Sequence, residues 1–210
     1  MIYWWHFGFR GNLKPRQILD KGVEMALTYF EVVSDRLAKA RPKMHWTKEV
    51  AWFEPYSLAL LMATLVGRTR ERTRLSDHLH PNLAVETVAI PIEPALGDVL
   101  LCIAAPLQSK PMDIAPIKER LQKSRKQRPK LLLKTWQALQ SGDRAKFASG
   151  LADSTANFAK TTADDDRPST AIALEESILL ALAEERGWTD LSFDLPIAAR
   201  LVAHRSLEMA

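Results

Sequence analysis

The side chains that most often bind metals or act as nucleophiles are sparse in this sequence, and their spacing argues against a metal site. His78 and His80 stand two residues apart, with Asp77 beside them. This spacing places the two imidazoles on opposite sides of an extended segment, and about 200° apart on a helix, so a shared metal ion would need an unusual loop. We therefore predict no metal and no cofactor, and interpret both histidines as residues of a loop or a helix end.

Candidate nucleophiles and general acids are equally isolated. Cys102 lies in the apolar run of residues 100–104, which is typical of a buried core thiol. Glu175 and Glu176 are adjacent, and on a helix we expect their side chains to point apart. The sequence has no glycine-rich phosphate loop and no GxSxG, HExxH or zinc-binding spacing. We therefore predict that the protein is not an enzyme and has no small-molecule substrate.

Charge is distributed unevenly along the 210 residues. The chain has 29 lysines and arginines against 25 aspartates and glutamates, a net charge of +4. Residues 1–134 carry 22 basic and 13 acidic side chains, whereas residues 135–210 carry 7 and 12. Two basic clusters stand out, one made of Arg68, Arg70, Arg72 and Arg74, the other of Lys118, Arg120, Lys123, Arg125, Lys126, Arg128, Lys130 and Lys134. Such blocks affect the choice of partner more than the fold.

The basic stretch 118–134 could follow a phosphate backbone and gain affinity by releasing counterions. It lacks aromatic side chains that would stack on exposed bases, because Trp136 belongs to an apolar stripe. Nucleic-acid binding is therefore disfavoured but kept as an alternative. A solvated face, or a surface that meets an acidic protein, is the preferred interpretation.

Apolar side chains recur at helical spacing through most of the chain. Between residues 16 and 40 they follow steps of four and three, at Leu19, Val23, Ala26, Phe30, Val33 and Leu37. A second helix is predicted to start at Pro55 and to carry the arginine cluster at its far end. A third is predicted around residues 99–104, and a fourth from Asp113 until a stop or kink near Pro129. The remaining helices are predicted over 130–140, from 144 onward, from Ser169 or Thr170 to Arg186, and from Pro196 to Ala203.

These segments predict an all-α fold, a single domain over residues 1–210 with seven or eight helices that pack as hairpins. Little or no sheet is expected, although residues 85–92 and 191–195 could each be extended. Residues 172–183 are apolar on nearly all sides, which is typical of a central helix. Residues 161–167 are polar and acidic and are predicted to form a loop.

The N-terminal residues and the cysteine content bear on location. Residues 1–14 form an aromatic segment without a basic leader or a cleavage site, so we interpret it as packed structure. One cysteine cannot form an intrachain disulfide, which favours a reducing cytoplasm. No apolar run reaches about 18 residues, so no membrane span is predicted.

The most specific pattern is a helical hairpin in the second half. In residues 132–143 an alanine-leucine pair is followed by Ser141, Gly142 and Asp143, and then by Phe147 and Leu151. Glycine and aspartate there provide a C-cap and an N-cap back to back. This pattern resembles the hairpin of the immunity protein 49 type, an all-helical bacterial family of polymorphic-toxin immunity proteins. Residues 171–196 are similar to the end of these proteins, so the resemblance covers residues 132–202.

The resemblance implies a cytoplasmic antitoxin that binds a cognate toxin domain and blocks it by occlusion, without turnover. Carboxylates would attract the cation-rich cleft of such a toxin, and such binders rely on charge and a few buried anchors. We therefore predict partner contacts at Asp164, Asp165, Asp166, Glu184 and Glu185.

Two other interpretations of the sequence stay open. The arginine cluster at residues 68–74 is the competing partner surface. Helical-repeat proteins of the tetratricopeptide kind share the same capping pattern, so a repeat adaptor with a concave groove is a second alternative, beside the nucleic-acid-binding protein.

Overall fold

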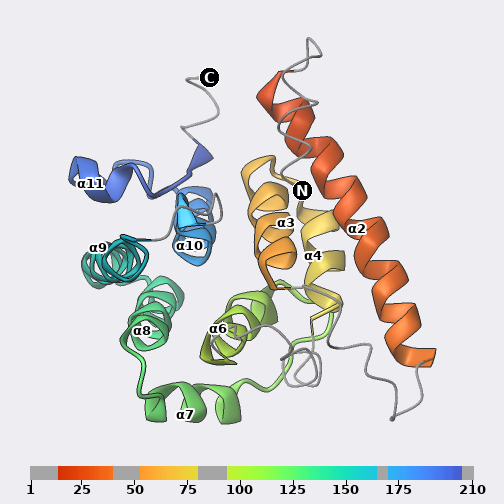
Figure 1. The fold of residues 1–210 in the computed structure, drawn as a ribbon, viewed down its shortest axis with the longest axis horizontal. Helices are drawn as coiled ribbons and strands as arrows, with labels where there is room; N and C mark the ends of the chain where they lie inside the picture. Colours follow the sequence, from red (N-terminus) through yellow and green to blue (C-terminus); the bar gives the residue numbers. More distant parts are fainter. Residues whose placement is uncertain (1–13, 40–52, 80–93, 165–169, 205–210) are drawn as a thin grey trace.

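The computed structural model of the protein describes residues 14–39, 53–79, 94–164 and 170–204. Within these ranges it is built of nine α-helices and one short 3-10 helix, without a β-strand, so the predicted all-α fold is confirmed (Figure 1). The elements are α2 (Pro15–Lys39), α3 (Phe53–Leu65), α4 (Thr69–Asp77), α6 (Pro94–Ala104), η2 (Ala105–Leu107), α7 (Ala115–Lys123), α8 (Gln127–Ser141), α9 (Arg144–Thr161), α10 (Leu174–Glu185) and α11 (Leu195–Ala198).

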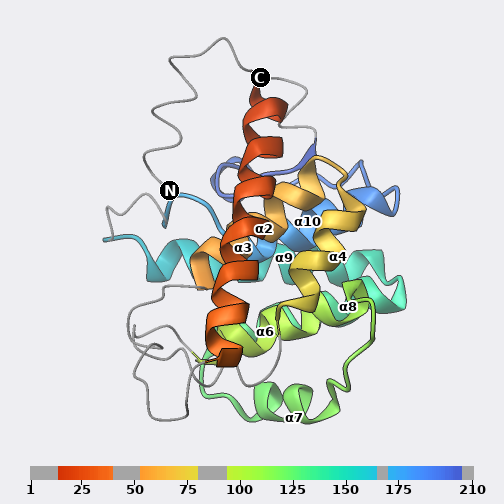
Figure 2. The same cartoon turned by 90° about the vertical axis from the view of Figure 1, so that its right-hand side faces the viewer.

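Helices α3 and α10 pack against each other at the centre of the molecule (Figure 1). On one side of this pair lie α2 and α4, and on the other the antiparallel hairpin of α8 and α9, with α11 against α9. Helix α6 closes the bottom of the bundle and α7 lies outside it, against α6 and α8 (Figures 1 and 2). The two halves of the sequence therefore meet along α3 and α10.

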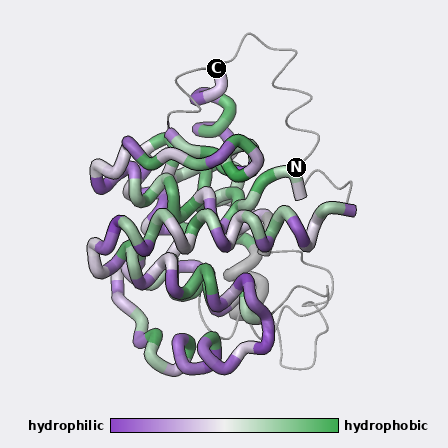
Figure 3. The backbone as a smooth tube through the Cα atoms, turned by 90° about the vertical axis from the view of Figure 1, so that its left-hand side faces the viewer, coloured by the Kyte–Doolittle hydropathy of each residue, from purple (hydrophilic) through white to green (hydrophobic). Residues whose placement is uncertain are grey.

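One connected core joins these helices. Buried apolar residues of α3 and α10, such as Leu60, Ala63, Ile178 and Leu180, lie at its centre, so α10 is the central helix predicted in this part of the chain, although it begins at Leu174. The outer helices contribute one face each, for example Phe147 and Leu151 from α9. Hydrophilic and hydrophobic residues alternate along α8 and α9, as expected for helices that are half covered (Figure 3).

The predicted hairpin between α8 and α9 is confirmed. Gly142 ends α8 in the left-handed region at φ 77°, where residues with a side chain are strained. The next residue, Asp143, caps α9, because its carboxylate accepts a hydrogen bond from the backbone N–H of Lys146 at 3.1 Å. Local signals in the sequence are sufficient to determine this turn.

The helix predicted from Pro55 is wrong at its far end. Gly67, at φ 71°, follows the end of α3, and the arginine cluster runs from the N-cap of the separate helix α4, Arg68, to its last turn, Arg74. These cations therefore do not complement the negative end of the α3 dipole. Their charge is compensated by carboxylates of other helices, as described below.

Three other predicted helix boundaries also differ. Helix α7 ends at Lys123, and Pro129 lies in the first turn of α8, where its missing N–H costs nothing. Helix α10 begins at Leu174 and not at residue 169 or 170.

Helix α11 ends at Ala198 because the chain then turns to run along α10, where the N–H of Val202 bonds Ser177 Oγ. Residues 191–194 have no regular structure, and Leu195 begins α11. Residues 85–92 lie outside the described ranges.

Candidate functional site

A cluster of buried charges joins four helices at the centre of the molecule. Arg128, in the first turn of α8, contacts Glu175 and Glu176 at the start of α10. Its Nη2 lies 2.6 Å from Glu175 Oε2 and 2.7 Å from Glu176 Oε2, and its Nε donates to Glu176 Oε1 at 2.9 Å. Ser57 of α3 donates to Glu175 at 3.1 Å, and Ser154 of α9 donates to Glu176 at 2.5 Å. We call these five residues the buried ion cluster.

In this cluster the positive charge of Arg128 and the negative charges of Glu175 and Glu176 stabilise one another. Burial alone would lower the pKa of Arg128, but the two carboxylates outweigh burial and raise that pKa above its ordinary value. The guanidinium also stacks on the Phe158 ring, 4.6 Å from its centroid. The first turn of α10 adds the positive end of its dipole beside Glu175 and Glu176. Because Arg128 engages both carboxylates, the cluster connects α8 with α10.

The expectation that the side chains of Glu175 and Glu176 point apart is therefore wrong. Their carboxylates meet at Arg128, whose Nη2 contacts an oxygen of each, while its Nε holds the second oxygen of Glu176. Sequence reasoning missed this cluster. Its signals were Ser154 at a core position of the α9 stripe and two glutamates inside the apolar run of α10.

The arginine cluster is also largely engaged inside the molecule. Arg68 contacts Asp20 at 2.8 Å and Glu24 at 3.3 Å, both on α2, and Arg74 pairs with Glu31 of α2. Arg72 is buried and donates to Glu185 at the end of α10, at 2.6 Å. These pairs hold α4 against α2 and α10, which reduces the competing partner surface at residues 68–74 mainly to Arg70.

The acidic residues predicted to contact a partner differ in their surroundings. Asp164 is exposed, three residues after the end of α9, and Asp165 and Asp166 lie outside the described ranges. Glu184 is buried and accepts a hydrogen bond from the backbone N–H of His204 at 2.7 Å. Glu185 pairs with Arg72. The last two carboxylates thus already serve contacts within the fold, while Asp164 faces solvent.

The basic stretch 118–134 divides into engaged and available cations. Lys118 lies over the Trp136 ring, 5.0 Å from its centroid. Arg120 pairs with Asp98 at 2.7 Å, and Lys123 with Glu119 at 2.5 Å. With Arg128 in the buried ion cluster, the cations that form neither an ion pair nor a ring contact with a described residue are Arg125, Lys126, Lys130 and Lys134.

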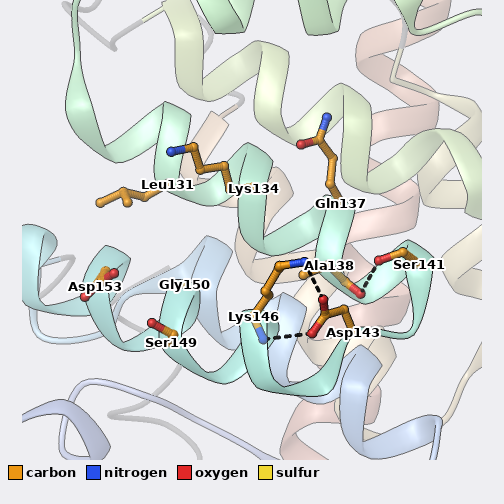
Figure 4. A pocket seen from close by; sticks show the side chains of 10 residues that line it. All are labelled: Leu131, Lys134, Gln137, Ala138, Ser141, Asp143, Lys146, Ser149, Gly150 and Asp153. Atoms are coloured by element: carbon orange, nitrogen blue, oxygen red, sulfur yellow. Dashed lines mark hydrogen bonds and ion pairs between the residues drawn. The ribbon is translucent and has the colours of Figure 1, made fainter.

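A shallow hollow of about 500 Å³ opens between α8 and α9 on the outer face of the hairpin (Figure 4). Its residues from α8 include Lys134 and Gln137, and those from α9 include Lys146, Ser149 and Asp153. Small residues, Ala138 and Gly150, also line the hollow. Lys146 is engaged with the Asp143 carboxylate at 2.8 Å, whereas Lys134 extends away from α9 (Figure 4).

Cys102 and His78 lie in positions where burial shifts their pKa away from the charged form. Cys102 is buried in α6, and burial raises the pKa of its thiol to about 12, so the thiolate needed for nucleophilic attack is scarce at neutral pH. His78 is half-buried at the end of α4, and burial lowers its pKa. His80 lies outside the described ranges. In the described part of the chain, no three histidine, cysteine, aspartate or glutamate side chains are placed to hold a metal ion.

Comparison with known proteins adds no relative. No protein-family model, no curated protein and no solved structure matches this chain. The resemblance of residues 132–202 to the immunity protein 49 type stays a prediction. Among the helices that the structure describes, none has the length and apolar character required to cross a lipid bilayer.

Proposed function

We propose that the protein is an immunity protein that binds a cognate toxin domain and neutralises it by occlusion. The observation that carries the proposal is the α8–α9 hairpin, in which Gly142 and Asp143 occupy the capping positions on which the resemblance depends. The helices α10 and α11 follow, so the part of the chain that resembles the family is helical throughout its regular elements.

Occlusion requires a surface whose shape is fixed before the partner arrives, because ordering side chains on binding costs free energy. The buried ion cluster supports such a surface. It ties α8 and α9 to α10 and α3 through Arg128, Ser154 and Ser57. The outer hairpin is thereby held on the core, and its exposed side chains have a fixed backbone beneath them.

Co-expression tests the proposal. Candidate toxin domains encoded beside the gene for this chain are each expressed in bacterial cells with and without this protein, and survival is measured. We expect survival only with the protein, together with a complex of the two purified proteins in calorimetry. Cells that survive without this protein would contradict the proposal. Cells that die although the protein is present, together with the lack of a complex in calorimetry, would contradict it as well. A matched control is an unrelated toxin domain, against which no protection is expected.

The acidic loop has its own test within the same system. Reversing the charges of Asp164, Asp165 and Asp166 to lysine should slow association with the toxin domain, because a cation-rich cleft would lose its electrostatic attraction. The association rate of the variant is compared with that of the wild type at low salt. Equal rates would remove this loop from the partner surface and leave the immunity function standing.

A further inference from the structure

Three lysines lie along one side of α8, each four residues from the next. Lys126 is the N-cap residue, and Lys130 and Lys134 follow at spacing that places side chains on the same face of a helix. Lys126 and Lys134 are exposed and Lys130 is partly exposed, and Arg125 precedes them at the surface. We call Arg125, Lys126, Lys130 and Lys134 the basic face.

Within the described part of the chain, no acidic side chain is paired with this basic face. None of its four cations forms an ion pair with a residue that the structure describes, in contrast to their neighbours Lys123 and Arg128. The first turn of α8 contains no acidic side chain, although the N-terminus of a helix carries partial positive charge. Like charges gathered there oppose folding, so stability does not account for them.

The hollow between α8 and α9 adjoins the basic face. Lys134 belongs to both, and Leu131 and Gly150 line the hollow beside it. An opening of this kind accepts a side chain from a partner while the lysines contact its charged groups. Asp153 is the acidic residue of the hollow outside the Asp143–Lys146 pair, so cations prevail along this side of α8.

We propose that the basic face and the hollow together dock an acidic surface of a protein partner, which, if the proposed immunity function holds, is the toxin domain. Charge complementarity identifies the chemistry, carboxylates against Lys126, Lys130 and Lys134. These three residues extend over about 12 Å of helix, which suits a protein loop better than a duplex with many phosphates in sequence. The adjoining hollow accommodates a side chain of that loop.

The test uses the full chain and the toxin domain against which it protects cells in the co-expression experiment. The variant Lys126→Glu/Lys130→Glu/Lys134→Glu is compared with the control Lys14→Glu/Lys21→Glu/Lys110→Glu, which changes the net charge equally at exposed lysines of other segments. At low salt we expect the association rate of the α8 variant to be about one tenth of the wild-type rate or lower. The control variant should associate at the wild-type rate. The melting temperature of the α8 variant should be equal to or above that of the wild type, because glutamates at 126 and 130 suit the helix N-terminus and Lys134 is exposed.

The outcomes separate this inference from the proposed function. Equal association of the α8 variant and the control would overturn the docking surface while the immunity function stands. Failure of the wild-type protein to bind the toxin domain would overturn both. Binding of duplex DNA that matches or exceeds toxin binding at physiological salt, and that is lost in the α8 variant, would assign the basic face to nucleic acid and overturn the protein partner. If the triple variant does not fold, Lys130→Gln/Lys134→Gln replaces it, with slower association again expected.

Discussion

Arg128 shows at the scale of a residue how burial changes the role of a charge. It lies between Lys126 and Lys130, which belong to the basic face, yet its own guanidinium points into the core. A buried charge costs several kcal/mol unless it is paired and hydrogen-bonded. The carboxylates of Glu175 and Glu176 meet this requirement, and each of them also accepts a hydroxyl hydrogen bond.

Removing Arg128 alone should therefore destabilise the fold. Arg128→Met leaves Glu175 and Glu176 buried without their cation, and we expect the free energy of unfolding in urea to fall by about 3–5 kcal/mol. Arg128→Met/Glu175→Gln/Glu176→Gln should lose less, because the amides keep their serine contacts and carry no charge. Arg125→Met, at an exposed position, should change the free energy by less than about 0.5 kcal/mol. A loss for Arg128→Met as small as that for Arg125→Met would contradict this account.

Asp143 provides a test of the helix cap through its ionisation. The side chain and the backbone N–H of Lys146 bond the Asp143 carboxylate and hold its pKa below the ordinary value of 3.8. A carboxyl whose pKa is depressed by folding stabilises the fold above that ordinary value, and the contribution is lost as the pH falls through the folded pKa. NMR titration of the carboxyl carbon should show a lowered pKa that rises in Lys146→Met. Arg144→Met, which removes a neighbouring cation paired with Asp190, should leave it unchanged.

At the scale of elements, the α8–α9 hairpin depends on close approach of its helices. Gly150 of α9 faces Thr135 of α8, and a methyl group placed on Gly150 would lie 2.6 Å from Thr135 Oγ1. The hydroxyl is not free to move away, because it donates to the carbonyl of Leu131 at 2.9 Å. The small residue at position 150 is therefore required by packing.

Gly150→Ala should destabilise the protein although alanine favours a helix. The overlap with Thr135 is expected to outweigh the propensity gain and to lower the free energy of unfolding by about 1–2 kcal/mol. Thr135→Ala/Gly150→Ala should recover most of the loss, since the hydroxyl is gone. Ser149→Ala, at the exposed neighbouring position, serves as the control with little change. Stabilisation by Gly150→Ala alone would show that the helices are free to separate there.

At the scale of the whole molecule, ion pairs connect the basic first part of the chain with the acidic last part. Arg128 reaches Glu175 and Glu176, and Arg72 of α4 reaches Glu185 of α10. The uneven charge of the sequence is thus partly cancelled within the fold. The charged side chains that take no part in these ion pairs are the ones available to contact a partner.

A double-mutant cycle on Arg72 and Glu185 measures one of these connections. Arg72→Met, Glu185→Gln and the double variant should give a coupling of about 1–2 kcal/mol in urea unfolding, because Arg72 is buried. The same cycle on the exposed pair Lys123 and Glu119 should give less than about 0.5 kcal/mol. Equal couplings in the two cycles would contradict the view that burial makes the first pair important.

The sequence by itself determined the helical class and the local turns. Apolar spacing predicted α2, α8 and α9, and the glycine and aspartate at 142 and 143 predicted the hairpin between α8 and α9. These predictions succeeded because capping and periodicity depend on residues within about four positions of one another. Gly67 was missed as a break, since a single glycine can either end a helix or lie within one.

Only the tertiary structure decided which charges belong to the fold and which to the surface. Arg128 and Lys130 are both basic residues in the same stretch, yet one is paired with two glutamates of α10 and the other forms no ion pair with a described residue. The partners of Arg128 stand 47 and 48 residues away, and the partner of Arg72 stands 113 away. Such pairing follows from how the helices pack around α3 and α10, and no periodicity within one helix contains that information.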